Sequence, residues 1–233
     1  MHISSAIFDC SAPDLDACPD ESLPEFAFIG RSNAGKSSLL NLLAGQEGLA
    51  RVSPTPGFTK LINFFTINQT WRLVDLPGYG FAEGAKKHRA RFNQAVARYL
   101  TQRTNLCLVF ALVDSGLPPQ ELDLEFVEWL AGNAVPFVLV FTKTDKEPPA
   151  TVQANIAAFK ESISAWFERA PASFTCSATK PQGRPELLGA IAEAMSAIQA
   201  EAKQTPVSPA SVPALGRKAK PGGKPRPDLQ RPW

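Results

Sequence analysis

The feature that most constrains this fold is the stretch GRSNAGKS at residues 30–37, which has the pattern G-x4-G-K-[ST]. It follows an apolar segment at 25–29 and leads into a helical pattern at 36–44, so we expect it to join a strand to a helix. Its glycines let successive backbone N–H groups point at one anion, and the N-terminus of the helix faces the same place. Lys36 can place its charge on the β- and γ-phosphates of a nucleotide, and Ser37 offers a hydroxyl to Mg²⁺. The stretch therefore predicts a P-loop.

Strand-like and helical segments alternate between about residues 24 and 200, which favours right-handed βαβ crossovers. The predicted strands lie at 25–29, 61–67, 71–75, 107–113, 136–141 and 172–175. The predicted helices lie at 36–44, 86–103, 119–131, 149–169 and 184–200. The second and third strands flank a polar turn and are typical of an antiparallel hairpin. We therefore expect an α/β P-loop NTPase: a doubly wound, mostly parallel six-stranded sheet with helices on both faces and one antiparallel edge strand.

The charge of the chain is unevenly distributed and suggests three parts. Residues 1–23 are expected to be an N-terminal extension, 24–202 the nucleotide-binding domain and 203–233 a tail. From residue 204 onward there are six basic residues, one acidic residue and seven of the 21 prolines, so we expect the tail to be disordered. It is either a second, mobile contact with nucleic acid or a solubilising extension. The remaining composition, 44% hydrophobic and 20% charged, excludes a wholly disordered or fibrous protein.

The sequence predicts neither a membrane span nor a secretory signal, and we expect a cytoplasmic protein. The longest apolar run, 106–113, is far shorter than the roughly 20 residues that cross a bilayer, and the acidic N-terminus lacks the positive start of a signal peptide.

The four cysteines have no zinc-site spacing. Cys107 and Cys176 are predicted core residues, and a disulfide between Cys10 and Cys18 is conceivable but disfavoured by a reducing compartment.

Two further motifs follow the strands predicted at 71–75 and 172–175. Asp75, Leu76, Pro77 and Gly78 form D-x-x-G, in which the carboxylate can hold Mg²⁺ through water and the glycine N–H can reach the γ-phosphate. This short pattern is also that of a turn ending a strand. The stretch SATK at 177–180 could direct backbone N–H groups at the O6 atom of guanine. Both motifs gain meaning from their order behind a P-loop.

The motif that predicts the base is Thr142, Lys143, Thr144 and Asp145, at the end of the strand predicted at 136–141. Guanine presents its N1–H and 2-amino group as adjacent donors, and one carboxylate, that of Asp145, can accept from both. Adenine lacks this pair and would leave the carboxylate unpaired, at a cost of about 1–3 kcal/mol. The Lys143 stem can cover one face of the base. The alternative is a polar loop that caps a helix.

The segments GRSNAGKSSLLNLL, TPGFTKLINFF, LVDLPGYGFA and TKTD together resemble the bacterial EngB (YihA/YsxC) GTPases of the TrmE–Era–EngA–EngB–Septin-like superfamily, over about residues 20–200. The resemblance implies an EngB-type G domain at 24–202 and makes Thr59 the switch I residue that completes the Mg²⁺ shell with Ser37 and, through water, Asp75. It implies that Lys36, Asn33, Thr59 and Gly78 serve catalysis. The GTP-binding residues it implies are Gly30, Arg31, Ser32, Asn33, Ala34, Gly35, Lys36, Ser37, Ser38, Gly57, Phe58, Thr59, Lys60, Leu61, Asp75, Leu76, Pro77, Gly78, Thr142, Lys143, Thr144, Asp145, Cys176, Ser177 and Ala178.

One position departs from the pattern of many GTPases. Tyr79 stands where a glutamine often orients the attacking water, and a phenol cannot substitute in the same way, so slow intrinsic hydrolysis is expected.

Asn33 matches a P-loop asparagine that helps to hold a potassium ion against the phosphates in related GTPases. K⁺ there would stabilise transition-state charge much as an arginine finger does. The alternative for Asn33 is a loop residue that bonds its own backbone.

Basic residues gather on the helix predicted at 86–103 and on its approach: Lys86, Lys87, His88, Arg89, Arg91, Arg98 and Arg103. They form either a solvated face or a phosphate-contacting surface next to switch II. The resemblance implies GTP and GDP as ligands, the large ribosomal subunit or its rRNA as partner, and a link to cell division and septation. We expect a monomer.

Four functions remain open on the sequence: a GTP-hydrolysing switch on an RNA–protein particle; a module that binds GTP with negligible turnover and acts by occupancy; a P-loop kinase or ATPase, which Asp145 opposes; and a structural RNA-binding protein.

Overall fold

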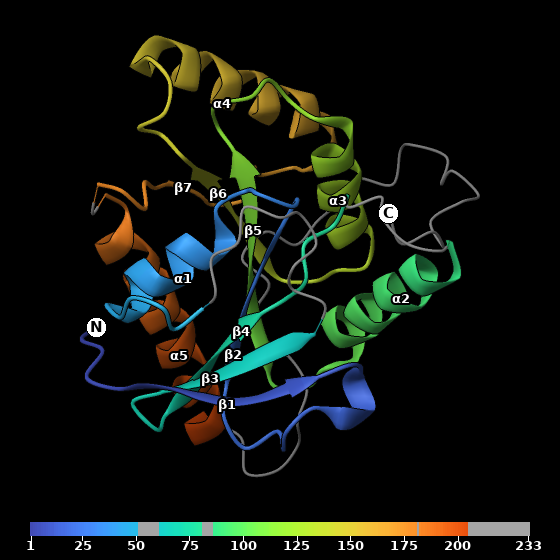
Figure 1. The fold of residues 1–233 in the computed structure, drawn as a ribbon, viewed down its shortest axis with the longest axis vertical. Helices are drawn as coiled ribbons and strands as arrows, with labels where there is room; N and C mark the ends of the chain where they lie inside the picture. The colour runs from blue at the N-terminus through green and yellow to red at the C-terminus, as the bar shows by residue number, and fades with distance from the viewer. Residues whose placement is uncertain (51–60, 81–85, 181, 205–233) are drawn as a thin grey trace.

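The computed structural model describes residues 1–50, 61–80, 86–180 and 182–204, without the side chains of 86–93 and 201–204. Figure 1 shows the fold. Its strands are β1 (Ala6–Ala12), β2 (Glu25–Gly30), β3 (Ile62–Ile67), β4 (Trp71–Asp75), β5 (Leu106–Asp114), β6 (Phe137–Thr142) and β7 (Ser173–Thr175). Its α-helices are α1 (Lys36–Ala44), α2 (Lys86–Gln102), α3 (Glu121–Gly132), α4 (Pro149–Ile163) and α5 (Arg184–Gln204), with 3₁₀ turns η1 (Leu15–Ala17) and η2 (Ser164–Trp166).

The strands form one sheet in the order β1-β3-β4-β2-β5-β6-β7. β4, β2, β5, β6 and β7 pair in parallel, while β3 pairs antiparallel with both β4 and β1. β2 is buried along its whole length and β5 at eight of its nine residues, because helices cover both faces of these central strands. The predicted doubly wound, mostly parallel α/β sheet is confirmed.

Two apolar cores fill the layers on either side of the sheet. One packs α2, α3 and α4 on one face, with Tyr99, Phe126 and Phe159 at its centre. The other packs α1 and α5 on the opposite face through Leu40 and Leu187. Figure 1 shows α1 and α5 on one side of the strands and α2 and α3 on the other. The carboxyl ends of β2, β4 and β6 therefore open at one edge, where ligand sites of open α/β sheets occur.

The sheet has seven strands rather than the expected six. The additional strand, β1, lies in the segment that we expected to be an extension, and it pairs with β3 from Ala6↔Ile67 to Ala12↔Ile62. Its edge position leaves Ile7 and Phe8 exposed, so it lacks the alternation that identifies a half-buried strand. The hairpin of β3 and β4 is confirmed, and Asn68 and Gln69 turn it with positive φ angles of 48° and 57°.

The helix expected at 149–169 ends at Ile163 and continues only as the 3₁₀ turn η2. Phe167 is already extended, with φ −130° and ψ 138°, and its ring packs on Phe137 at 6.1 Å between centroids.

The tail from 205 onward lies outside the described residues. Cys10 and Cys18 are free thiols, and Cys107 and Cys176 are free and buried, as the sequence indicated. Among the described residues, every helix is too short or too polar to cross a membrane.

Candidate nucleotide-binding site

The P-loop connects β2 to α1, as the sequence predicts. Gly35 has φ +88° and serves as the N-cap residue of α1, so a side chain there would be strained. Asn33 also has a positive φ, 68°, which asparagine tolerates better than most residues. The N–H of Ala34 donates to the carbonyl of Arg31 at 3.0 Å and tightens the turn. The loop thereby sets the N-terminus of a nine-residue helix beside its own backbone, the arrangement that binds phosphate.

Lys36 and Asp75 come together at the mouth of this loop. The Lys36 ammonium pairs with Asp75 Oδ1, and the amide of Asn63 donates to Oδ2 at 3.4 Å. Ser37 follows at the first turn of α1 and is half-buried. The described residues contain no cluster of three His, Cys, Asp or Glu side chains that could hold a metal. One carboxylate and one hydroxyl suit Mg²⁺ instead, because it binds few protein ligands and completes its shell with phosphate oxygens and water.

The residues after Asp75 run directly along the P-loop. The backbone N–H of Leu76 donates to the carbonyl of Phe28 at 3.0 Å. The backbone N–H of Tyr79 donates to the carbonyl of Gly30 at 3.2 Å, and the carbonyl of Tyr79 accepts from the N–H of Ser32 at 3.1 Å. A Cβ on Gly78 would lie 2.9 Å from the carbonyl oxygen of Gly30, so only glycine fits this approach. The D-x-x-G segment therefore lies directly beside the P-loop.

Tyr79 lies in the core. Its phenol donates to Asp123 of α3 at 3.0 Å, and its ring packs 4.5 Å from that of Phe126. Burial, and then the charge of Asp123, raises the pKa of Tyr79 well above its usual range. Since the hydroxyl donates to Asp123 of α3, this side chain cannot orient an attacking water as glutamine does in many GTPases.

The motif at 142–145 lies against the other side of the P-loop. Thr142 donates its hydroxyl to the carbonyl of Ala34 at 2.7 Å and so ties the end of β6 to the loop. Lys143, with φ 60°, pairs with Asp114 at 2.7 Å, and its stem would lie 3.9 Å from a Cβ placed on Gly35. Asp114 ends β5 and was not singled out in the sequence analysis. A carboxylate at the end of a parallel strand was the signal that could have found it.

Asp145 is held in place by the stretch at 177–180. Its two carboxylate oxygens accept from the hydroxyls of Ser177 and Thr179, each at 2.6 Å. These bonds, that of Ser177 first, lower the pKa of Asp145 below its ordinary value of 3.8, so the group is an anion at neutral pH. The carbonyl of Cys176 accepts from the N–H of Thr144 at 3.4 Å and from its hydroxyl at 3.2 Å. The two segments that the sequence predicts to read guanine are therefore joined.

The structure does not test every expected site residue. Gly57, Phe58, Thr59 and Lys60 lie outside the described residues, while Leu61 precedes β3 with 40% of its surface exposed. Ser38 is half-buried in the first turn of α1, and Ala178 is exposed beside Ser177. Pro77 is buried between Leu76 and Gly78.

The basic surface expected on the helix at 86–103 is only partly available. Arg103, which follows α2, is buried and donates to fully buried Glu25 at 2.7 and 2.9 Å. Tyr99 donates to the same carboxylate at 2.8 Å. Arg98 pairs with Asp16 of the N-terminal segment at 3.2 Å. Arg103 therefore stabilises the core, and neither alternative offered for it, a solvated face or a phosphate-contacting surface, is correct. The side chains of Lys86, Lys87, His88, Arg89 and Arg91 are outside the described set.

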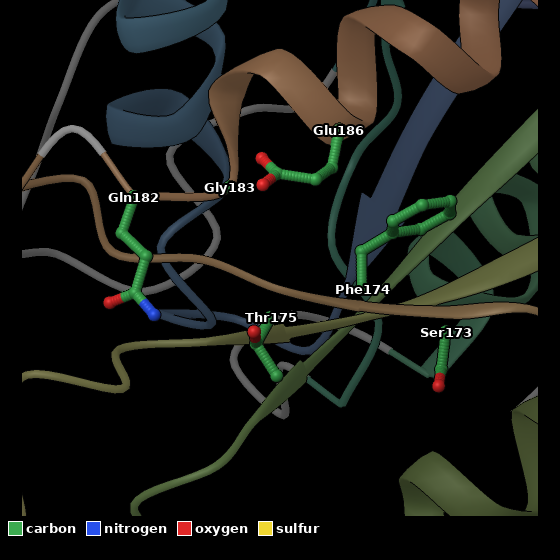
Figure 2. Close-up of a pocket in the computed structure, with 6 residues that line it drawn as sticks. All are labelled: Ser173, Phe174, Thr175, Gln182, Gly183 and Glu186. Atoms are coloured by element: carbon green, nitrogen blue, oxygen red, sulfur yellow. The ribbon is translucent and has the colours of Figure 1, made fainter.

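A separate hollow of about 210 Å³ lies between β7 and the start of α5 (Figure 2). It is lined by Ser173, Phe174, Thr175, Gln182, Gly183 and Glu186. Glu186 is the one charged side chain of this lining, so the hollow does not suit a phosphate. It shares no residue with the predicted nucleotide site.

The fold, the P-loop and the facing Asp145 define a P-loop nucleotide-binding protein. Residues 25–143 match the family model described as "50S ribosome-binding GTPase". "Probable GTP-binding protein EngB" of Bacteroides fragilis is 45% identical over 191 residues, which cover 82% of this chain and 95% of that protein. The protein of that name from Cytophaga hutchinsonii is 47% identical over 189 residues, covering 81% and 95%. A crystal structure of a probable GTP-binding protein engB superposes with a TM-score of 0.56 at 24% identity, over 74% of this chain and 98% of that one.

The chain belongs to the EngB family of GTP-binding proteins. It is thus a P-loop GTPase, and the resemblance drawn from its motifs is confirmed. A kinase, an ATPase and a purely structural RNA-binding protein are set aside by this membership.

Proposed function

We propose that this GTPase acts as a nucleotide-controlled switch in assembly of the large ribosomal subunit, and that normal cell division and septation depend on that role. The observation that carries the proposal is the match of residues 25–143 to a family described as 50S ribosome-binding GTPases. The protein works as a cytoplasmic monomer in this proposal, and its link to cell division and septation is indirect, through ribosome assembly.

The nucleotide is proposed to lie across the ends of β2, β4 and β6. The P-loop N–H groups and Lys36 bind its phosphates, and Asp145 accepts from the guanine N1–H and 2-amino group while Lys143 covers the base. The short bonds from Ser177 and Thr179 support this assignment, because they fix the carboxylate that reads the base.

Mg²⁺ would be held by Ser37 and Thr59, and by Asp75 through water, and when bound it neutralises charge on the β- and γ-phosphates. The Lys36–Asp75 pair supports this arrangement, since it places the two groups at one point. Hydrolysis transfers the γ-phosphoryl group to water, giving GDP and phosphate. Lys36 and the N–H of Gly78 stabilise the charge that develops on the phosphoryl oxygens.

A second cation is proposed to compensate for the missing water-orienting side chain. Asn33 is exposed in the P-loop, and its backbone is left-handed with a φ of 68°. Held there, K⁺ would supply positive charge to the transferring phosphoryl group.

A second candidate function keeps the same site but no useful turnover: GTP occupancy alone would set affinity for the ribosome. Burial of Tyr79 favours it, because the phenol donates to Asp123 instead of orienting a water as glutamine does in many GTPases. Comparing GTP turnover with and without large ribosomal subunits separates the two. Stimulation by the subunit supports the switch, and an unchanged negligible rate supports occupancy.

The direct experiment is binding of the full chain to purified large subunits with GDP or a non-hydrolysable GTP analogue, at two salt concentrations. We expect tighter binding with the analogue at both salts. Lys36→Ala should abolish the difference between the two nucleotides, while Lys160→Ala, on α4 and outside the predicted nucleotide site, should leave it intact. Equal, salt-sensitive binding in both nucleotides would refute the switch and leave only a basic surface that holds RNA.

A further inference from the structure

The segment 78–80 is wedged between the P-loop and the first turn of α3. Gly78 closely approaches Gly30, and the backbone of Tyr79 bonds to residues on both sides of Arg31. A Cβ on Gly80 would lie 3.0 Å from Leu122 Cδ1 and 3.2 Å from Arg31 Cγ. Residues 78–80 therefore pack tightly against both the P-loop and α3; we call this contact the seam.

Asp123 is the polar centre of this seam. It is 1% exposed, accepts the Tyr79 phenol on Oδ1 at 3.0 Å and lies 3.5 Å from Arg31 Nε through Oδ2. Arg31 belongs to the P-loop, and Tyr79 follows the glycine of D-x-x-G. One buried carboxylate thus contacts the two segments that must face the phosphates together.

We propose that Asp123 is a positioning residue for GTP: by holding the Tyr79 phenol and Arg31, it sets the Gly78 peptide where it meets the γ-phosphate. This rests on the proposed contact of the Gly78 N–H with that phosphate. A buried, charge-assisted bond is suited to the task, since it fixes a side chain more firmly than packing alone.

GDP has no γ-phosphate, which gives the proposal a specific signature. Loss of the bond between Tyr79 and Asp123 should lower the affinity for a non-hydrolysable GTP analogue and leave the affinity for GDP nearly unchanged. A side chain that merely stabilised the fold would weaken both nucleotides alike or neither.

The test measures affinity for both nucleotides in the full chain by fluorescence titration. Tyr79→Phe keeps the ring on Phe126 but removes the phenol, and we expect analogue affinity to fall about tenfold, as for loss of one hydrogen bond to a charged group. Asp123→Leu should behave alike. Asp123→Asn keeps an acceptor for the phenol and should recover most of the analogue affinity. Glu121→Gln, an exposed acid in the same turn of α3, is the matched control and should match the wild type.

Equal loss for the two nucleotides, or no loss in Tyr79→Phe, would overturn the proposal. Thermal melts identify any variant that fails to fold. If Asp123→Leu fails to fold, Tyr79→Phe still tests the proposal. Failure of the wild type to bind GDP would instead refute the proposed nucleotide site. KM and kcat give a second readout: loss of the Tyr79–Asp123 bond should raise KM for GTP and also lower kcat, because the Gly78 N–H is proposed to stabilise the charge that develops on the phosphoryl oxygens.

Discussion

Lys36 and Asp75 form an ion pair that closes the P-loop against the end of β4. Their side chains are only 10% and 4% exposed, so the pair is shielded from solvent. In the proposed complex each group exchanges this partner, Lys36 for a phosphate and Asp75 for a water on Mg²⁺. Asp75 therefore competes with the nucleotide for the ammonium group of Lys36.

Asp75→Asn should separate these two effects. Mg²⁺ should no longer tighten GTP binding in this variant, because the carboxylate that orients its water is lost. Affinity for GDP without Mg²⁺ should equal or exceed that of the wild type, since Lys36 loses its competitor. Titrations with and without chelator measure both, with the remote exposed Asp16→Asn as control. A wild-type response to Mg²⁺ in Asp75→Asn would contradict the metal assignment.

Potassium dependence tests Asn33. Replacing Na⁺ with K⁺ should raise the wild-type hydrolysis rate about tenfold, equivalent to about 1.4 kcal/mol of transition-state stabilisation. Asn33→Gly tolerates the same φ of 68° without the side chain, so it should lose this difference and still bind GDP. Equal wild-type rates in the two salts would remove K⁺ from the account.

Gly183 should be intolerant of a side chain. It has φ +87°, and a Cβ would lie 2.2 Å from the carbonyl oxygen of Thr175, so Gly183→Ala should lower the free energy of unfolding by about 2 kcal/mol or more. Gly189→Ala, in α5 with nothing within 4 Å of the added Cβ, should be neutral or stabilising by up to about 1 kcal/mol. Denaturant melts of the two variants test this, and equal effects would contradict the geometry.

The ion pair of Arg103 and Glu25 should matter far more than that of Arg98 and Asp16. Arg103→Met leaves a fully buried carboxylate without its main partner and should cost about 3–5 kcal/mol of stability. Arg98→Met breaks a pair whose side chains are 39% and 75% exposed, and should cost about 0–1 kcal/mol. Denaturant unfolding measures both. A larger loss of stability in Arg98→Met than in Arg103→Met would contradict the stabilising role assigned to the buried pair.

The sequence alone predicted the parts of this molecule that local pattern determines. The P-loop was predictable because its residue types and spacing are required by backbone geometry, and β2 and β5 because burial on both faces gives continuous apolar runs. The hairpin was predictable from the polar turn at Asn68.

Other features depend on contacts between distant segments and leave little local signal. β1 is an edge strand held by pairing with β3, so its exposed Ile7 and Phe8 break the expected alternation. Arg103 belonged by sequence to a basic run, but its partner Glu25 is 78 positions away. The bond between Tyr79 and Asp123 spans 44 positions and follows only from the packing of α3.

The central claim is that Asp145 makes this P-loop site specific for guanine, and Asp145→Asn tests it most directly. An amide donates where the carboxylate accepted, and xanthine carries a carbonyl in place of the guanine 2-amino group. We expect the variant to lose about 100-fold or more in affinity for GTP and to gain affinity for xanthosine triphosphate. Glu147→Gln, two residues further along, should retain the wild-type preference. Unchanged GTP affinity in Asp145→Asn would contradict the proposed site.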